Sequence, residues 1–266
     1  MPPISSQPVA LSIAGSDCSA GAGIQADLKT LQQLDVHGLC AVTSIVSETP
    51  LEVREIAPVA TALIQSQIRI LLETYPITAI KTGMLPSRSC IISVSEILQD
   101  LNIPIVTDPV MVASSGSSLM EDDAAAAMAQ RLIPLCALVT PNIPEASALL
   151  GREISSKVDL EQAARDISEK FQTSCLLKGG HLPSGEDRLD ILWHAGRAHH
   201  FTHPDANIGE GIHGTGCTLS ASITGHLAHG KSMEQAVKLG ISHVQKLIAE
   251  AKAWQRGDQT IKSLGW

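Results

Sequence analysis

Residues 212–220 have the types and spacing needed to bind an anion. Two glycines, a threonine and a cysteine precede a run of small and apolar residues with helical spacing, so Gly214, Thr215 and Gly216 are predicted to form the first turn of a helix. The N–H groups of a first turn lack partners within the helix and carry the positive end of its dipole. Cys217 follows where that field favours its thiolate. A tight glycine turn without a ligand is the alternative from this segment alone.

Polar residues recur at the ends of other predicted strands. They are Asp17 with the glycine loop after it, Glu48, Gly83 and Met84, Asp108, the segment 140–145, and the segment 178–181. Each of these alone is compatible with an ordinary turn. Ligands of open parallel sheets bind beyond the carboxyl ends of the strands, so the recurrence predicts one shared site at that edge.

The elements that position these residues alternate along the chain. Strands are predicted over residues 9–14, 39–46, 79–83, 105–109, 137–140 and 175–178, with helices near 24–34, 58–73, 90–101, 122–132, 142–150 and 160–171. This alternation predicts a mostly parallel sheet with right-handed crossovers. Residues 189–194 and 197–203 indicate an antiparallel hairpin at the sheet edge, followed by helices at 215–229 and 233–252. No linker or repeat divides the sequence, so residues 1–266 are expected to form one domain.

Composition excludes several classes of protein. The chain has only two Phe, three Trp and one Tyr, so its core is aliphatic and suits a buried parallel sheet. A net charge of −8 without a basic run argues against a nucleic-acid partner. Residues 1–8 lack the features of a secretion signal, no apolar run is long enough to span a membrane, and the six cysteines are scattered. We therefore expect a cytoplasmic protein with no membrane partner.

Two other ligand classes are disfavoured by spacing. Residues 21–26 fit the G-x-G-x-x-A pattern of dinucleotide folds, but Gly21 lies six positions beyond Gly15. The ribose-binding acid expected about 20 positions further on is also missing, because Glu48 comes too late. The histidines at 199, 200, 203, 226 and 229 lack a cysteine or carboxylate to complete a set, which disfavours a zinc site.

Six motifs together resemble one known family. Segments 15–30, 81–85, 108–111, 140–145, 177–181 and 213–218 are similar, in order, to the hydroxymethylpyrimidine/phosphomethylpyrimidine kinases of thiamine synthesis. The resemblance covers about residues 9–250 and implies a ribokinase-like three-layer α/β sandwich, with a mostly parallel central sheet, helices on both faces and an antiparallel edge hairpin. It also implies ATP-dependent phosphorylation of 4-amino-5-hydroxymethyl-2-methylpyrimidine and of its monophosphate, with Mg²⁺, in a homodimer. A pyridoxal-type kinase and a catalytically idle pyrimidine-binding homologue are the alternatives.

The resemblance assigns roles at the phosphate end of the site. Gly214, Thr215 and Gly216 would form an anion hole for the transferring phosphoryl group, with Cys217 as the base where most ribokinase-like enzymes have an aspartate. Lys178 would bring positive charge to the phosphates. The nucleotide- or phosphate-binding set is Asp108, Thr140, Asn142, Lys178, Gly214 and Gly216, and the Mg²⁺ set is Asp108 and Glu145. From spacing alone, Asn142 is equally an N-cap and Glu145 a first-turn acid.

At the acceptor end the resemblance assigns Gly15, Asp27, Glu48 and Met84, with Asp27 also in the catalytic set. Spacing alone places Asp27 on the solvent side of its helix. The family usually has glutamine in place of Glu48, and an ionised glutamate accepts hydrogen bonds without donating any. Either a ring nitrogen or Glu48 is then protonated in the complex, or the preferred acceptor differs.

Overall fold

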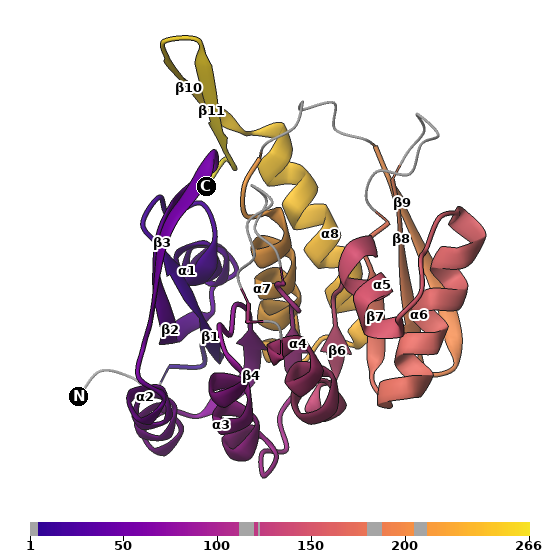
Figure 1. Ribbon diagram of the computed structural model, residues 1–266, viewed down its shortest axis with the longest axis horizontal. Helices are drawn as coiled ribbons and strands as arrows, with labels where there is room; N and C mark the ends of the chain where they lie inside the picture. The colour runs from indigo at the N-terminus through magenta and orange to yellow at the C-terminus, as the bar shows by residue number, and fades with distance from the viewer. Residues whose placement is uncertain (1–4, 112–119, 122, 180–187, 205–211) are drawn as a thin grey trace.

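The computed structural model describes residues 5–111, 120–121, 123–179, 188–204 and 212–266. Its main sheet has nine strands in the order β3-β2-β1-β4-β5-β6-β7-β8-β9 (Figure 1). The strands are β1 (Val9–Asp17), β2 (His37–Thr49), β3 (Glu52–Pro58), β4 (Ile77–Thr82), β5 (Ile105–Thr107), β6 (Leu138–Val139), β7 (Ser174–Leu177), β8 (Arg188–His194) and β9 (Arg197–His203). The pairs from β2 through β7 are parallel, and β3, β8 and β9 are antiparallel to their neighbours.

Helices cover both faces of this sheet. They are α1 (Gly23–Gln33), α2 (Thr61–Thr74), α3 (Arg88–Leu98), α4 (Ala124–Ala127), α5 (Ile143–Leu150), α6 (Lys157–Phe171), α7 (Thr215–Ala228) and α8 (Met233–Ala249). One apolar cluster joins the sheet to α2, α3 and α6, while a second joins it to α7 and α8 on the opposite face. The predicted three-layer, mostly parallel sandwich is confirmed.

Strand β1 shows how the sheet separates its two faces. Leu11 and Ile13 belong to the core cluster shared with α2 and α3, whereas Ala10 packs against Leu31 of α1. Ser12 also faces α1 and is completely buried. Because side chains alternate along a strand, this places a polar group under the helix that follows the first glycine loop.

The predicted edge hairpin is confirmed. Strands β8 and β9 pair from Arg188↔His203 to His194↔Arg197. The two residues that join them, Ala195 and Gly196, have φ of 50° and 76°. Positive φ at both positions matches the right-handed twist of the flanking strands, as two-residue hairpin turns require.

Several elements differ from the sequence prediction. Strand β3 was missed, because its charged, mostly exposed residues lack the alternation of a half-buried strand, and α2 begins at Thr61 instead of residue 58. The helix predicted over 233–252 ends at Ala249, and a second hairpin follows, β10 (Lys252–Arg256) and β11 (Gln259–Ser263). In the predicted helix 122–132, residue 122 lies outside the described residues, and α4 continues as a π-helix over Met128–Leu132. Pro134 follows, which cannot donate a helical hydrogen bond.

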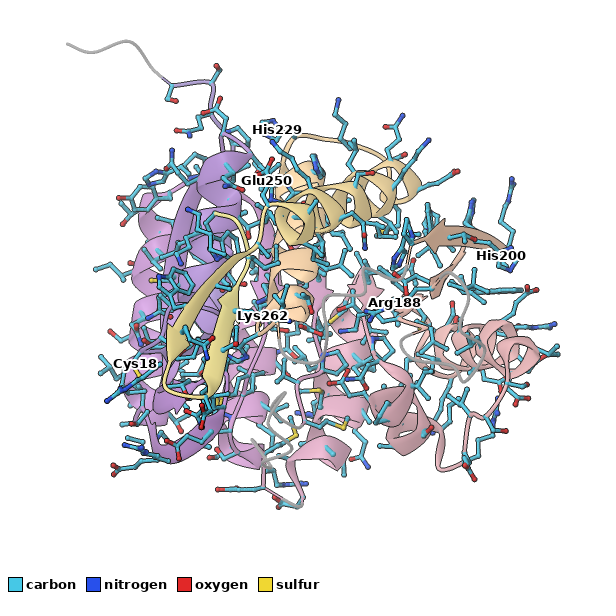
Figure 2. The ribbon with its side chains drawn as sticks, turned by 90° about the horizontal axis from the view of Figure 1, so that it is seen from above. Cys18, Arg188, His200, His229, Glu250 and Lys262 are labelled. Carbon is cyan, nitrogen blue, oxygen red and sulfur yellow. The ribbon has the colours of Figure 1, made fainter. Side chains whose placement is uncertain are left out.

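The missed C-terminal hairpin lies above the carboxyl edge of the main sheet. Figure 1 shows it extending from the end of α8, and Figure 2 shows Lys262 on it. Lys262 of β11 forms an isolated parallel bridge with Ile212, the residue before His213. The end of the chain therefore contacts the segment that leads into α7.

Among the described residues, no helix combines the length and the apolar character needed to cross a membrane.

Candidate functional site

A cavity of about 330 Å³ lies where the carboxyl ends of the parallel strands meet the start of α7. The structure brings to its wall most of the residues predicted from sequence: Gly15, Glu48, Met84, Asp108, Asn142, Glu145, Lys178, Gly214, Thr215, Gly216 and Cys217. They come from segments up to 200 positions apart, so the strand-end pattern in the sequence corresponds to one site in space. Asp27 and Thr140 are not among the residues that line the cavity.

The start of α7 is built by direct contact between two backbone segments. Gly214 is the N-cap, with φ of 86°. A Cβ at this position would overlap the carbonyl oxygen of Gly21 in the first glycine loop. A side chain is therefore excluded by both conformation and space, and the free N–H groups of the first turn of α7 are held beside the cavity.

Next to this helix start lies an ion pair. Lys178 Nζ is 3.0 Å from Asp108 Oδ1. A Cβ on Gly216 would lie 3.3 Å from Asp108 Oδ2 and 3.4 Å from Lys178 Nζ, so the glycine leaves room around both groups. Burial opposes the charge of Lys178, but Asp108 and Glu145 hold its pKa above the usual range. A permanent cation and a helix N-terminus thus face the same space, which suits a phosphate group.

Asn142 and Glu145 form a capping box at the start of α5. Asn142 Oδ1 accepts from Glu145 N at 2.9 Å, and Glu145 Oε2 accepts from Asn142 N at 2.8 Å. The N-cap interpretation of Asn142 is therefore confirmed, and both side chains also line the cavity. Burial raises the pKa of Glu145 to about 7, against the opposing effect of Lys178 and with a further rise from Asp108.

The residues around Lys178 fit a magnesium–phosphate group. Asp108 and Glu145 provide carboxylate oxygens, which Mg²⁺ prefers, and Mg²⁺ sites in proteins commonly use one or two carboxylates together with phosphates. The space that a Gly216 side chain would fill lies directly beside Asp108. The donor set and the shape of the site therefore agree with such a group.

Cys217 differs from the sequence expectation in its charge. The helix dipole was expected to favour a thiolate, but burial raises the pKa of Cys217 to about 11, although Lys81 and a hydrogen bond from Gly23 N–H lower it. Desolvation outweighs the field of the first turn, so the resting side chain is a thiol.

Asp27 is not the solvent-facing residue that its spacing predicted. It is completely buried, with Oδ2 accepting from Ser12 Oγ at 2.5 Å and Oδ1 2.6 Å from Lys81 Nζ. The prediction was wrong because Ser12 and Lys81 form polar positions under α1 that periodicity cannot show. Thr140 is also buried, behind the cavity wall, where its Oγ1 donates to Asp108 Oδ1 at 3.3 Å.

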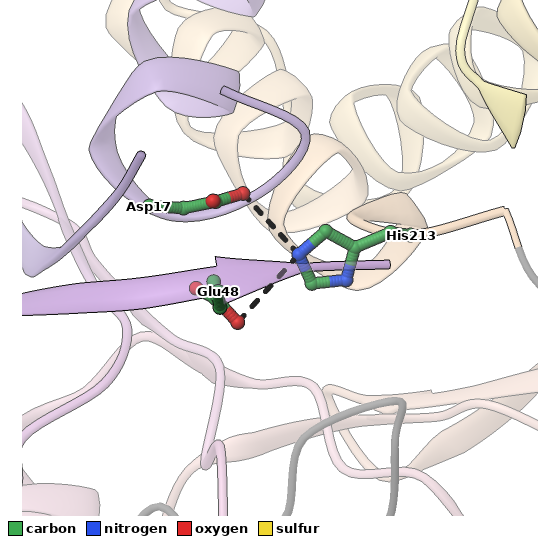
Figure 3. A group of neighbouring side chains, drawn as sticks. All are labelled: Asp17, Glu48 and His213. Carbon is green, nitrogen blue, oxygen red and sulfur yellow. Dashed lines mark ion pairs between the residues drawn. The ribbon is translucent and has the colours of Figure 1, made fainter. Parts of the chain in front are cut away.

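Sequence reasoning missed a cluster formed by Asp17, Glu48 and His213 (Figure 3). His213 Nε2 lies 3.2 Å from Asp17 Oδ2 and 3.8 Å from Glu48 Oε2. Asp17 also accepts hydrogen bonds from the N–H groups of Gly21 and Ala22, at 3.0 and 2.7 Å. Burial raises the pKa of Asp17, but hydrogen bonds from His213, Ser19 and the N–H of Ala22 outweigh this effect and lower the pKa to about 2. The residues were visible in separate motifs, but their contact joins segments almost 200 residues apart.

Sequence reasoning also missed three polar residues of the cavity wall. Asp190, His203 and Gln245 line the cavity, with His203 Nε2 3.0 Å from Asp190 Oδ2 and Nδ1 3.0 Å from Gln245 Nε2. The sequence pattern marked this hairpin only as a sheet edge. His199 and His200 pair with acids other than Asp190, namely Glu234 and Glu161, so these three histidines do not share one centre.

A parallel sheet covered on both faces, with a glycine helix start, a lysine and two carboxylates at its carboxyl edge, defines a ribokinase-like phosphotransferase. More narrowly, the chain belongs to the phosphomethylpyrimidine kinase family, whose model matches residues 17–262. The family and fold inferred from the six motifs are both confirmed, and the chain is a kinase.

Three relatives illustrate the similarity. A putative hydroxymethylpyrimidine/phosphomethylpyrimidine kinase of Schizosaccharomyces pombe is 41% identical over 92% of this chain, which spans about half (47%) of that relative. The crystal structure of a Clostridium difficile phosphomethylpyrimidine kinase has 34% identity and a TM-score of 0.81, covering 91% of this chain and 100% of that one. The Staphylococcus aureus pyridoxal kinase in complex with AMP-PCP and pyridoxal has 32% identity and a TM-score of 0.86, covering 98% of this chain and 94% of that one.

Gly214→Ala should destabilise the protein by roughly 1–3 kcal/mol and weaken nucleotide binding, because the side chain meets both an unfavourable φ and the Gly21 carbonyl. Gly230→Ala is the matched control, since Gly230 has φ of 73° but nothing within 4 Å of its added Cβ. Urea denaturation and nucleotide titration measure the two effects. Equal losses for the two variants would show that the contact with Gly21 is unimportant.

Asp17 should make the free energy of unfolding depend on pH in the acid range. Its pKa is lower in the folded protein than the ordinary 3.8, so its contribution is complete above pH 3.8 and is lost as the pH falls toward 2. The difference corresponds to about 2 kcal/mol. Urea denaturation between pH 2 and 5 should show this slope in the native protein and a much smaller one in Asp17→Asn. The exposed Asp100→Asn is the control, and an unchanged slope in Asp17→Asn would contradict the assignment.

Proposed function

We propose that this kinase transfers the γ-phosphoryl group of ATP to the hydroxymethyl group of 4-amino-5-hydroxymethyl-2-methylpyrimidine, and then phosphorylates the monophosphate, in thiamine synthesis. One observation carries the proposal: Gly15, Glu48 and Met84 line the same cavity as the Gly214–Cys217 helix start and Lys178. Membership of the phosphomethylpyrimidine kinase family supports the same acceptor.

At the phosphate end, the chain supplies positive charge and position. Lys178 and the free N–H groups at the start of α7 face the space left by Gly216, where they would stabilise charge on the transferring group. Asp108 and Glu145 would hold Mg²⁺, which neutralises phosphate charge when bound. Glu145 is more available as a ligand when deprotonated, and its pKa of about 7 puts that change near neutral pH.

Cys217 would accept the proton of the substrate hydroxyl. In that step the proton passes to Sγ, the substrate oxygen bonds to the γ-phosphorus, and the bond from phosphorus to ADP breaks. Cys217 lies at the third position of α7, three residues beyond the Gly214 N-cap, so the base and the anion hole share one helical turn. The resting thiol with a pKa of about 11 must first lose its proton to act.

At the acceptor end, Met84 and Glu48 would bind the ring. Met84 is 8% exposed and packs with Val46, where its thioether can cover a flat ring. Burial raises the pKa of Glu48, Asp17 raises it further, and His213 opposes the rise. A neutral carboxyl offers one O–H donor and one acceptor, as a glutamine amide offers both functions. Of the alternatives left open by the sequence, we favour a protonated Glu48.

A pyridoxal-type acceptor is the second candidate. The S. aureus pyridoxal kinase, solved with pyridoxal, superposes with a TM-score of 0.86, against 0.81 for the C. difficile phosphomethylpyrimidine kinase. Pyridoxal also carries a hydroxymethyl arm on a flat ring. The similarity of the folds therefore does not distinguish the two substrates. The acceptor assay below distinguishes them.

ADP release from ATP should depend on the aminopyrimidine, and should be at least about tenfold faster with it than with pyridoxal or without an acceptor. Cys217→Ser should lower kcat while nucleotide affinity stays close to normal. Product analysis would show whether the monophosphate is converted to the diphosphate. Preference for pyridoxal would select the second candidate, and the absence of acceptor-dependent release would refute both.

The KM for the aminopyrimidine should rise with pH if a neutral Glu48 binds the ring, because deprotonation removes its O–H donor. Glu48→Gln should bind with little pH dependence, since an amide does not titrate in this range. Glu52→Gln, on the exposed neighbouring strand, is the matched control and should keep the native profile. Identical pH profiles for the native protein and Glu48→Gln would exclude Glu48 from ring recognition.

The Mg²⁺ requirement, the homodimer and the cytoplasmic location remain predictions drawn from the family and the composition. Metal titration, light scattering and cell fractionation test them in turn.

A further inference from the structure

We propose that Lys81 is a positioning residue whose buried ammonium, held by Asp27, stabilises negative charge on Cys217. This inference rests on the proposed function in one respect, the use of Cys217 as the base. It concerns a residue that does not line the cavity, and it gives Asp27 a role through Lys81 instead of direct contact with substrate.

The first argument is the burial of the pair. Lys81 is 1% exposed and Asp27 is 0% exposed, and their ion pair of 2.6 Å is completed by Ser12. Taking two such charges out of water is unfavourable, and a well-packed apolar pair is often equally or more stable. A buried pair in this position is therefore poorly explained by stability alone.

The second argument is the place of the ammonium. Lys81 lies two residues before Gly83, whose backbone lines the same cavity as Cys217. A Cβ on Gly83 would lie 3.3 Å from Lys81 Nζ. The glycine thus leaves the lysine head directly behind the cavity wall. Among the described residues, Asp27 is the hydrogen-bond acceptor of this ammonium, which carries three N–H groups.

The third argument is the set of charges around Cys217. Asp27 comes from α1, Lys81 from β4, Asp108 from the end of β5 and Lys178 from the end of β7. Burial raises the pKa of the thiol, and among the charged groups Lys81 lowers it most, while Asp27 and Asp108 raise it. Removing the positive charge of Lys81 should therefore lower the population of the Cys217 thiolate.

The test is alkylation of Cys217 by iodoacetamide at pH 9, without substrate or metal. The thiolate is the reactive form, so the rate reports its population. Lys81→Met should slow alkylation of Cys217 by at least about threefold, and Lys81→Arg, which keeps a positive charge at this position, should restore most of the native rate. Peptide mass spectrometry follows Cys217 separately, and the exposed Cys18 in the same chain provides the internal reference.

A second measurement uses turnover. If Lys81 acts through Cys217, Lys81→Met should lower the kcat of the native protein by at least about tenfold. The same substitution should have little further effect on the kcat of Cys217→Ser. Lys81→Arg should recover part of the rate. Circular dichroism confirms that each variant is folded, and Lys81→Gln carries the alkylation test if Lys81→Met does not fold.

Equal alkylation rates in the native protein and the folded variants would overturn the proposal. So would equal slowing in Lys81→Met and Lys81→Arg, since a general loss of packing would produce that result. The alkylation assay contains no acceptor, so a failure of aminopyrimidine phosphorylation would not be confused with a failure of this inference.

Discussion

The site depends on the contact between the start of α7 and the first glycine loop. Gly214 packs directly on the carbonyl of Gly21, and Asp17 accepts hydrogen bonds from the N–H groups of the same loop. His213, the residue before Gly214, lies against Asp17 as well. One carboxylate therefore joins the end of β1 to the segment that leads into α7. The same contact helps to place the start of α7 beside the cavity, in addition to the packing of α7 against α1, α8 and β4.

Around that contact, the charges are arranged by depth. Lys178 and Asp108 reach the cavity, where a phosphate can interact with them, whereas Lys81 and Asp27 form a neutral pair behind the wall. Charged groups of both pairs interact electrostatically with the Cys217 thiol and affect its pKa. Burial strengthens each of these interactions, since the surroundings screen charge less than water does. The same desolvation keeps the resting cysteine neutral.

Much of the fold was predictable because its signals are local. The alternation of strands and helices identified the parallel sheet, and Ala195–Gly196 marked the hairpin turn. The missed strands β3 and β10 carry few buried residues, so their patterns resemble those of loops. The end of α8 was predicted too late because no clear break in the apolar periodicity separates the helix from the exposed hairpin β10–β11. Exposed edge strands are stabilised by pairing with their neighbours, which local periodicity does not record.

The sequence by itself determined the family, the sheet and part of the cavity wall, because most of the motifs follow strands whose ends must reach the same edge. Only the tertiary structure decided which polar side chains face one another. It placed Asp27 inside against Lys81 and Ser12, Thr140 behind Asp108, and His213 between Asp17 and Glu48. The reason is physical: the protonation and partners of these groups depend on desolvation and on contacts between segments distant in the chain, and neither is contained in local spacing.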